Sequence, residues 1–562
     1  MAQISSLACL HLRRRHVSLP GIALLMLGFS VQLSVHAETT ITPEIETSSH
    51  AYWLRDQQLG SGLDKGVALL AEPSLTVSYS GAQGAGSAFI KNESVWYDDS
   101  QRNHKSLTSY LLNSGVTAFD NRLRFNMTAQ SAYQVRNSQN NVFSDIITGS
   151  ENLSRTDSYG AGLELASRST ATVRAKLNMS YRKFSSDQPD VDDGIGNFDN
   201  NNTQLKAQFA AGRRRSGLFW LLDATHDNTS RESLQDFSSE RINSVAGLPL
   251  LSSLSVILRG NYEDNSQNNT EAGNSNFSGY YRSFKSVGYG LEYRFGRASR
   301  INVTRNHASF SGDNASAGNE SSGKRVGNED YYAAEVHLVP SRRSSLTYSY
   351  DRRFFGSTST LTGQYNLRTI TARLSFSEAV QVLSNLDLVS EDLGVFVCPD
   401  GAQQITDCVR PPSSNYQLLP GQSFKQGIEQ SYDVSQELVK RRAAALNLGY
   451  SNRRVKLNLT ISEIEDEYVE SERLTETTML SAAAAWQISR RTSYQLSASH
   501  YDSSYDDIQR ADSNILVETG FEHQLNKDAK VGFMFRRTAR NSSLQQFNLE
   551  ENRLSLSYNH RL

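Results

Sequence analysis

Apolar and polar residues alternate along most of this chain, in segments of about ten residues that recur from about residue 106 to the end. In one segment Leu123, Phe125 and Met127 alternate with Arg124 and Asn126. The same period recurs in residues 173–181, 254–262, 287–295, 370–376 and 455–461. Successive side chains of a β-strand point to opposite faces, so each segment predicts a strand with one apolar and one polar face. We therefore expect an all-β chain.

The connections between these segments alternate in length. Short turns, such as Asp120-Asn121, Ser377-Glu378 and Asn526-Lys527, alternate with long stretches rich in Asn, Ser, Asp and Gly, such as residues 186–202 and 264–283. Bacterial transmembrane barrels have short periplasmic turns, long external loops and strands of about ten residues. We predict a transmembrane antiparallel up-and-down β-barrel of about 22 strands, in a range of about 18 to 24, with its first clear strand near Ala88–Tyr97.

Aromatic residues mark both ends of the predicted apolar faces. One set lies about ten residues after a short turn and comprises Tyr133, Tyr181, Tyr262 and Tyr350. The other set lies just before a short turn and comprises Phe295, Phe376, Trp486 and Phe521. Two such belts are expected where rings sit at the headgroup level on each side of a bilayer. A soluble β-solenoid or β-sandwich, the alternative for repeated strands, gives no reason for them.

The alternation over the last residues of the sequence predicts a half-apolar final strand. Leu554, Leu556, Tyr558 and Leu562 lie on one face, and polar residues beginning with Arg553 lie on the other. A final strand that pairs with the first one closes a membrane barrel. This end resembles the carboxyl-terminal assembly signal of bacterial outer-membrane barrels, which usually finish in Phe rather than in Leu. The resemblance implies recognition by the barrel insertion machinery.

The beginning of the chain has the features of a secretory signal. Three arginines, Arg13–Arg15, precede an apolar run that ends in Val35-His36-Ala37, a small-residue cleavage site. A membrane-anchoring helix is the alternative, and Pro20 and Gly21 interrupt the run that it would need. We predict a signal peptide at residues 1–37, a short periplasmic or lumenal segment at residues 38–73, and an outer-membrane barrel at residues 74–562. The middle segment is too short for the folded plug of the large TonB-dependent receptors, which argues against high-affinity uptake.

Charge and cysteines narrow the class further. Without the three signal-peptide arginines, 54 basic residues stand against 59 acidic ones, a net charge of −5 that is no signature of nucleic-acid binding.

Of the three cysteines, Cys9 belongs to the signal, which leaves Cys398 and Cys408 for a disulfide in an oxidising compartment. The pair lies in a long loop near residues 390–440. The loop is either a constriction or lid of the pore, or a stapled surface loop.

The polar face of each predicted strand is expected to line the lumen of the barrel. Its basic residues include Arg124, Arg174, Lys176, Arg182, Arg259, Arg300, Lys456 and Arg536. Its acidic residues, which are fewer, include Glu164, Glu292, Glu335, Asp351 and Glu518. A basic excess favours anions or acidic polymers in the lumen. Alternatively, opposite charges pair across neighbouring strands and fill the interior.

Signals for metal, cofactor or catalytic chemistry are incomplete. Residues 190–194 match part of a calcium loop but lack the closing glutamate, which favours a solvated acidic loop. His226, His307 and His500 are placed where an external or lumenal site could lie, but no nucleophile motif accompanies them. We therefore expect no metal, no cofactor and no enzymatic activity.

The whole layout, with its terminal strand, Arg-bearing turns and Asn/Ser-rich loops, resembles the outer-membrane barrel family associated with exopolysaccharide and PEP-CTERM sorting loci of Gram-negative bacteria. This resemblance implies export or surface assembly of polysaccharide, with outer-membrane lipid, lipopolysaccharide and periplasmic polysaccharide-export components as partners. We predict a channel-forming barrel in the bacterial outer membrane with that role. The alternatives are a passive porin for small polar solutes and a non-conducting structural barrel with ligand-binding loops.

Overall fold

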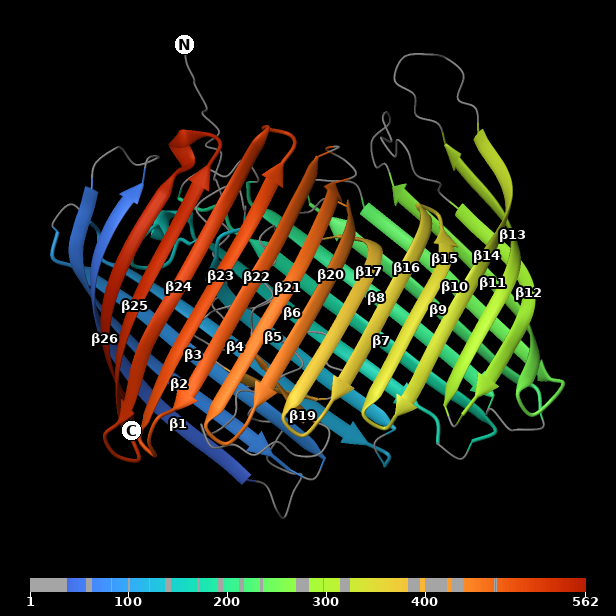
Figure 1. Cartoon of the computed structure of the whole chain (residues 1–562), viewed down its shortest axis with the longest axis horizontal. Coiled ribbons are helices and arrows are strands. Elements are labelled where there is room, and N and C mark those ends of the chain that lie inside the picture. Colours follow the sequence, from blue (N-terminus) through green and yellow to red (C-terminus); the bar gives the residue numbers. More distant parts are fainter. Residues whose placement is uncertain are drawn as a thin grey trace, which may run out of the picture.

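The computed structural model is a single closed antiparallel barrel of 24 strands, with one small separate hairpin (Figure 1). It describes residues 38–56, 63–81, 83–99, 102–120, 122–136, 143–168, 171–190, 196–211, 217–232, 236–268, 283–296, 298–313, 324–382, 395–399, 422–426, 438–468, 471 and 473–562. The all-β barrel prediction is confirmed, and the predicted count of about 22 strands is close to the 24 observed. Among the described residues, no helix has the length and apolar character needed to span a membrane.

Each strand of the barrel pairs with its neighbours in chain order, and the last pairs with the first. The strands are β1 (Glu38–Asp56), β2 (Leu63–Ser80), β3 (Gly84–Tyr97), β4 (Lys105–Ala118), β5 (Leu123–Gln134), β6 (Ser154–Ala166), β7 (Val173–Ser186), β8 (Phe198–Ala211), β9 (Phe219–Arg231), β10 (Asp236–Pro249), β11 (Leu254–Asn268), β12 (Ser283–Phe295), β13 (Ser299–Asp313), β14 (Lys324–Ser341), β15 (Ser344–Arg353), β16 (Gly356–Asn366), β17 (Ile370–Val382), β20 (Leu438–Ser451), β21 (Val455–Tyr468), β22 (Leu474–Gln487), β23 (Thr492–Tyr505), β24 (Arg510–Gln524), β25 (Ala529–Ser542) and β26 (Leu549–Arg561). Two short 3-10 helices, η1 (Ser150–Asn152) and η4 (Gln545–Phe547), lie in loops.

The alternation in the sequence becomes an outside and an inside. In β24, Ile515 and Phe521 are exposed on the outer face, whereas Asn514 on the inner face is buried. In β26, Leu554, Leu556 and Tyr558 are likewise exposed, and Arg553 between β25 and β1 is buried. Apolar side chains outside and polar side chains inside are the reverse of a soluble fold and suit a barrel in lipid.

The final strand closes the barrel as predicted. β26 pairs with β1 from Glu44 opposite Arg561 to Asp56 opposite Leu549. Beyond the strand, the backbone N–H of Leu562 donates to the Pro43 carbonyl at 3.0 Å. Every hydrogen-bonding edge of this sheet therefore has a partner strand, as a spanning sheet requires.

The predicted separate segment at residues 38–73 is wrong, because residues 38–56 are β1 and residues 63–73 begin β2. These two strands account for the difference between 22 and 24. In β1 the bulky Tyr52 and Leu54 point inward and are buried, although Ile41, Ile45 and Trp53 are exposed at outward positions as in the other strands. The inward apolar pair weakens the contrast of apolar outside and polar inside near the end of this strand, so its alternation is less clear than in the other strands.

The predicted turn at Ser377-Glu378 is also wrong. Both residues lie inside β17, and the turn is at residues 367–369, where the Leu367 N–H donates to the Ile370 carbonyl at 2.7 Å. Glu378 interrupts the apolar series because it faces outward and forms an ion pair with Arg442 of β20 at 3.1 Å. Phe376 consequently lies within a strand, opposite Ala444, and does not belong to an aromatic belt.

Several expectations fall where the chain is not described. The signal peptide at residues 1–37 and Cys408 lie outside the described residues, as do residues 191–195 of the acidic run. Cys398 lies in β18 (Val395–Pro399), which pairs with β19 (Gln422–Gln426) and places Cys398 opposite Ser423. The Cys398–Cys408 disulfide and the role of its loop therefore stay predictions.

Candidate functional site

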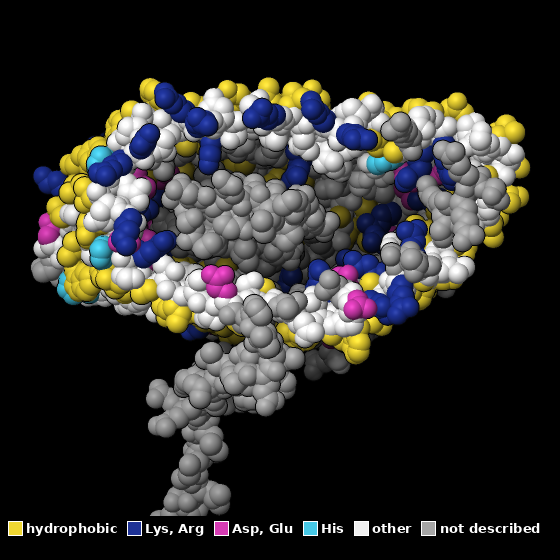
Figure 2. Space-filling view, turned by 90° about the horizontal axis from the view of Figure 1, so that it is seen from below, with side chains coloured by type: hydrophobic (Ala, Val, Ile, Leu, Met, Phe, Trp, Pro, Cys, Tyr) yellow, Lys and Arg dark blue, Asp and Glu magenta, His cyan; other side chains and the backbone are white. Residues whose placement is uncertain are grey.

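The interior of the barrel is the candidate site, because the inner wall carries most of the charge. Viewed from the short-turn end, the molecule is a flattened ring with Lys and Arg side chains along its inner wall (Figure 2). The strand register places all eight predicted lumen residues at inward positions, which are Arg124, Arg174, Lys176, Arg182, Arg259, Arg300, Lys456 and Arg536.

Four of these eight residues form ion pairs with acids of the wall. Lys176 Nζ lies 3.3 Å from Glu164 Oε1 across the β6–β7 pair, and Arg300 lies 2.7 Å from Glu335 across the β13–β14 pair. Arg259 pairs with Asp351, and Arg536 Nε lies 3.7 Å from Glu518. For these four residues, pairing between opposite charges describes the wall better than an uncompensated basic surface.

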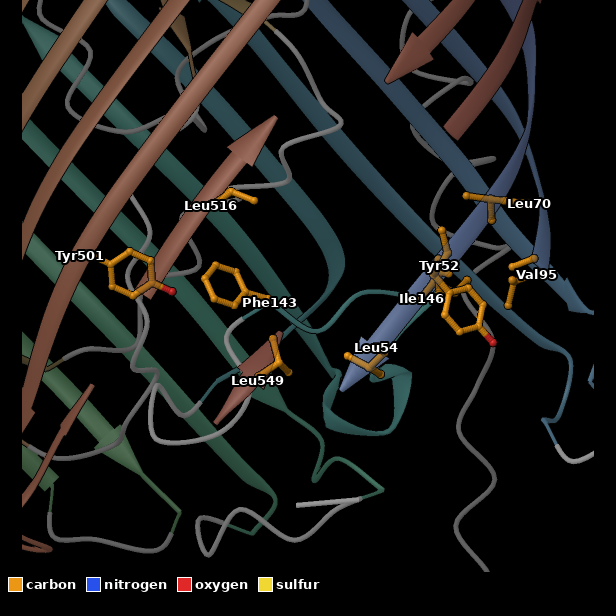
Figure 3. Close-up of a cluster of buried hydrophobic side chains, with 11 residues drawn as sticks. Tyr52, Leu54, Leu70, Val95, Phe143, Ile146, Tyr501, Leu516 and Leu549 are labelled. Atoms are coloured by element: carbon orange, nitrogen blue, oxygen red, sulfur yellow. The ribbon is translucent and has the colours of Figure 1, made fainter. Parts of the chain in front are cut away.

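One loop is folded into the lumen. It joins β5 to β6 at the external end, and its described part, residues 143–153, packs on the inner wall. Phe143, Ile146 and Ile147 are only 6%, 6% and 3% exposed. They pack in one cluster with inward apolar residues of β1, β2, β3, β23, β24 and β26, which are Tyr52, Leu54, Ala68, Leu70, Val95, Tyr501, Leu516 and Leu549 (Figure 3). The loop thus covers the line along which β26 meets β1, which we call the seam.

A buried polar network fixes the same loop to the last two strands. The Arg553 guanidinium donates to both carboxylate oxygens of Asp145, at 2.6 Å from Nη1 to Oδ2 and 3.1 Å from Nη2 to Oδ1. Arg536 of β25 donates to the same Oδ2 at 3.3 Å. The Thr148 hydroxyl donates to Glu551 Oε2 at 3.0 Å, and Arg553 Nε donates to Glu551 Oε1 at 2.6 Å. Bidentate guanidinium–carboxylate pairs of this kind are strong and geometrically specific.

The far side of the loop is held by β3 and the loop that follows it. The Tyr97 hydroxyl donates to the Ile146 and Ile147 carbonyls at 2.8 and 3.1 Å. Arg102 donates to the Ile147 carbonyl at 3.1 Å and lies over the Tyr52 and Tyr97 rings at 5.1 and 5.4 Å. Loop 143–153 is therefore anchored on both sides of the seam.

Asp145 is charged in this environment. Burial by itself raises the pKa of Asp145, but the guanidinium groups of Arg553 and Arg536, together with the backbone N–H of Thr148, outweigh burial. The pKa of Asp145 therefore lies well below its ordinary value. The carboxylate stays ionised at neutral and mildly acidic pH, and its ion pairs persist there.

At the opposite narrow end of the barrel, inward side chains of the wall contact one another directly. Arg259 and Glu263 of β11 form ion pairs with Asp351 and Arg353 of β15, four strands further along the wall. The Tyr331 hydroxyl of β14 also donates to Asp351, at 3.2 Å. Side chains four strands apart meet because the wall bends sharply here.

Two inward glycines of β12 permit this bend. A Cβ on Gly288 would meet the Asn306 side chain, and a Cβ on Gly290 would meet the Val303 carbonyl oxygen and lie 2.7 Å from Thr304 Cα. Glycine at both positions lets β12 and β13 approach each other on the concave side. Below, this region is called the bend.

The histidines considered as catalytic candidates do not line the lumen. His226, His307 and His500 all occupy outward positions and lie near Glu240, Asp330 and Asp502, at 3.3, 2.7 and 3.6 Å. Within the described part of the chain, no group of three or more His, Cys, Asp or Glu residues could hold a metal ion.

Sequence reasoning missed the inserted loop. Its signal is the apolar group of Phe143, Ile146 and Ile147 inside an otherwise polar external loop. Exposed loops are expected to be polar, so such a group indicates that a loop packs against something.

No protein-family model matches the chain, and no curated protein matches it. Among solved structures, the FrpB iron transporter from Neisseria meningitidis matches with 9% identity and a TM-score of 0.39, over 92% of this chain and 81% of that one. The siderophore receptor PirA from Acinetobacter baumannii matches with 10% identity and a TM-score of 0.42, over 94% of this chain and 81% of that one. Values this low describe a likeness between barrels, and no conclusion about cargo rests on them.

Proposed function

We propose that this protein is an outer-membrane barrel that forms a channel for polar solutes. The observation that carries the proposal is a closed 24-stranded wall with apolar side chains outside and charged ones inside. Inward side chains fill barrels of about eight strands, whereas barrels of about 16 or more enclose an aqueous channel or a plugged lumen. A wall this wide with a hydrophilic inner face suits the passage of hydrated solutes.

Export or surface assembly of exopolysaccharide is the more specific form of this proposal. It is supported by the layout that resembles polysaccharide-associated barrels and by the polar inner wall. Paired charges on that wall, such as Arg300 with Glu335, offer hydrogen-bond donors and acceptors to a hydroxyl-rich polymer without strong selection for its charge.

Single-channel conductance tests the proposal. The chain without its predicted signal is refolded in detergent, its heat-modifiable migration on gels is used to confirm a folded barrel, and it is inserted into planar bilayers. We expect large, stable conductance steps. A folded barrel that inserts but stays silent would overturn the channel and favour the structural alternative. Block by added neutral polysaccharide, and not by small sugars, would favour polymer passage over general diffusion.

A further inference from the structure

The outer face of β20–β23 contains an apolar groove near the periplasmic ends of the strands. The groove has a volume of about 490 Å³. Its floor is formed by small outward residues of neighbouring strands, Ala482 and Ala484 of β22 and Ala498 of β23. Leu457 and Leu459 of β21 stand on one side, opposite Ala484 and Ala482 in the register. The groove faces lipid, since it lies on the outer, apolar face of the barrel.

The turns that border this groove are basic. They are residues 367–369, 452–454 and 488–491, and they hold exposed Arg368, Arg453, Arg454, Arg490 and Arg491 and no acidic residue. Tyr450, which lines the groove, accepts a hydrogen bond from Asn452 of the middle turn at 2.8 Å. The groove therefore ends beside the middle one of these three basic turns.

Two of the other periplasmic turns of the barrel differ from this row. The turn between β4 and β5 pairs Arg122 with Asp120 at 3.2 Å, and the turn between β10 and β11, residues 250–253, has no charged residue. Figure 2, which views the short-turn end, shows a row of Lys and Arg side chains along one long rim. Other short turns also carry Arg, such as Arg342-Arg343 and Arg213–Arg215 in the sequence, so the candidate site is defined by basic turns that lie beside the groove.

We propose that this groove and its arginine turns bind a phospholipid with an anionic headgroup from the periplasmic leaflet. An acyl chain would occupy the Ala-floored groove, and the phosphate groups would lie against Arg453, Arg454, Arg490 and Arg491. Guanidinium groups donate paired hydrogen bonds to phosphate, and clustered Arg at a membrane surface attracts anionic lipid. The inference rests on the membrane location in the proposed function, but not on conduction.

A lipid fits these observations better than an acidic periplasmic protein. A soluble partner would contact the arginine turns from the periplasm. Such a partner would leave the apolar, lipid-facing groove next to these turns unexplained. A lipid carries an anionic head and an apolar chain in the order in which the turns and the groove follow each other along the strands. The same molecule therefore accounts for both features.

The test uses the folded chain in detergent, with retained lipid measured by native mass spectrometry during competition between phosphatidylglycerol and phosphatidylethanolamine. We expect the wild type to retain phosphatidylglycerol with a preference of about tenfold or more. The variant with Arg453→Ser, Arg454→Ser, Arg490→Ser and Arg491→Ser should lose this preference. The variant with Ala482→Leu and Ala484→Leu, which fills the groove, should retain less of both lipids.

Arg342→Ser with Arg343→Ser is the matched control, because this turn between β14 and β15 is also exposed and basic but does not border the groove. It should keep the wild-type preference. Equal loss in the control, or no loss in the fourfold variant, would overturn the site. If soluble poly-glutamate displaces the lipid and the groove-filling variant behaves as wild type, an acidic partner is the better reading.

Conductance separates this inference from the proposed channel. The fourfold variant should conduct as the wild type does, since its changes lie outside the lumen. A silent wild-type barrel that keeps its phosphatidylglycerol preference would refute the channel alone, and a conducting barrel without that preference would refute the lipid site alone.

Discussion

The two narrow ends of the barrel, the seam and the bend, are closed in different ways. At the seam, the first and last strands pair, and loop 143–153 crosses the line between them through Asp145, Arg553 and Arg536. At the bend, inward residues of β11 and β15 reach each other directly because Gly288 and Gly290 leave room. The difference follows from the chain: the bend lies within continuous sequence, whereas the seam joins its two ends.

The contacts at the seam join residues that are much further apart in the sequence than those at the bend. Asp145 and Arg553 are 408 residues apart, whereas Arg353 and Glu263 at the bend are 90 apart. Contacts of high sequence separation carry a larger loop-closure cost and form late. We infer that the inserted loop stabilises a junction that backbone pairing alone would complete last.

The largest expected effect comes from Arg553→Ala at the seam. Arg553 is only 5% exposed at its side chain and pairs with Asp145, which is 27% exposed, and with buried Glu551, so its removal leaves the Glu551 carboxylate buried without its guanidinium partner. Breaking a buried pair by removing one partner costs about 3–5 kcal/mol of unfolding free energy. Urea unfolding followed by heat-modifiable gel migration measures the change. Arg553→Lys is the control, because it keeps the charge and should recover part of the loss.

Gly290→Ala is the corresponding change at the bend. The new Cβ would press on the Val303 carbonyl and Thr304 Cα of β13, and backbone cannot yield as a long side chain can. Overpacking of this kind typically costs about 1–3 kcal/mol. Gly532→Ala in β25 is the control, since its Cβ would meet mainly the Ser557 hydroxyl, which is able to rotate away. Equal stability of the two variants would show that the bend is not tightly packed at β12.

Outward-facing patterns were the part of this fold that could be predicted from sequence. Leu123, Phe125 and Leu554 face lipid, and each is a local consequence of a period of two. Residues 38–73 were not recognised as barrel wall, and within them Tyr52 and Leu54, which point inward to meet the inserted loop, weaken the alternating pattern. Their apolar character depends on Phe143, Ile146 and Ile147, which lie about a hundred residues away, beyond the range of any local pattern.

For the charged lumen, the sequence predicted which residues face inward but not which residues they pair with. The alternation of side chains along the strand is enough to place Arg259 and Arg300 inside the barrel. Their ion-pair partners depend on how the wall curves. Glu335 lies on the strand next to Arg300, which a register argument could have found. Asp351 meets Arg259 across four strands, and only the bend at Gly288 and Gly290 brings them together.

Asp145→Asn tests the ion pairs at the seam through the pH dependence of the unfolding free energy. The folded pKa of Asp145 lies below its unfolded value, so its ionised form stabilises the fold above the unfolded pKa of about 3.9. That stabilisation is lost as the pH falls through the folded pKa. The wild type should therefore exceed Asp145→Asn in unfolding free energy by a constant amount between about pH 5 and pH 8, and the difference should shrink below about pH 4. A difference that changes near neutral pH would contradict the assignment.

The smallest effect is expected on the long wall, away from both ends. Lys176→Ala removes an ion pair with Glu164, but the two side chains are 47% and 34% exposed, so solvent screens their attraction. Pairs of this kind contribute about 0–1 kcal/mol to the unfolding free energy. Chemical unfolding of Lys176→Ala beside Arg553→Ala measures both in one experiment. If Lys176→Ala lowers the unfolding free energy as much as Arg553→Ala does, then the charged network at the seam contributes no more stability than an exposed ion pair of the long wall. The seam and the bend would then differ in geometry but not in their contribution to stability.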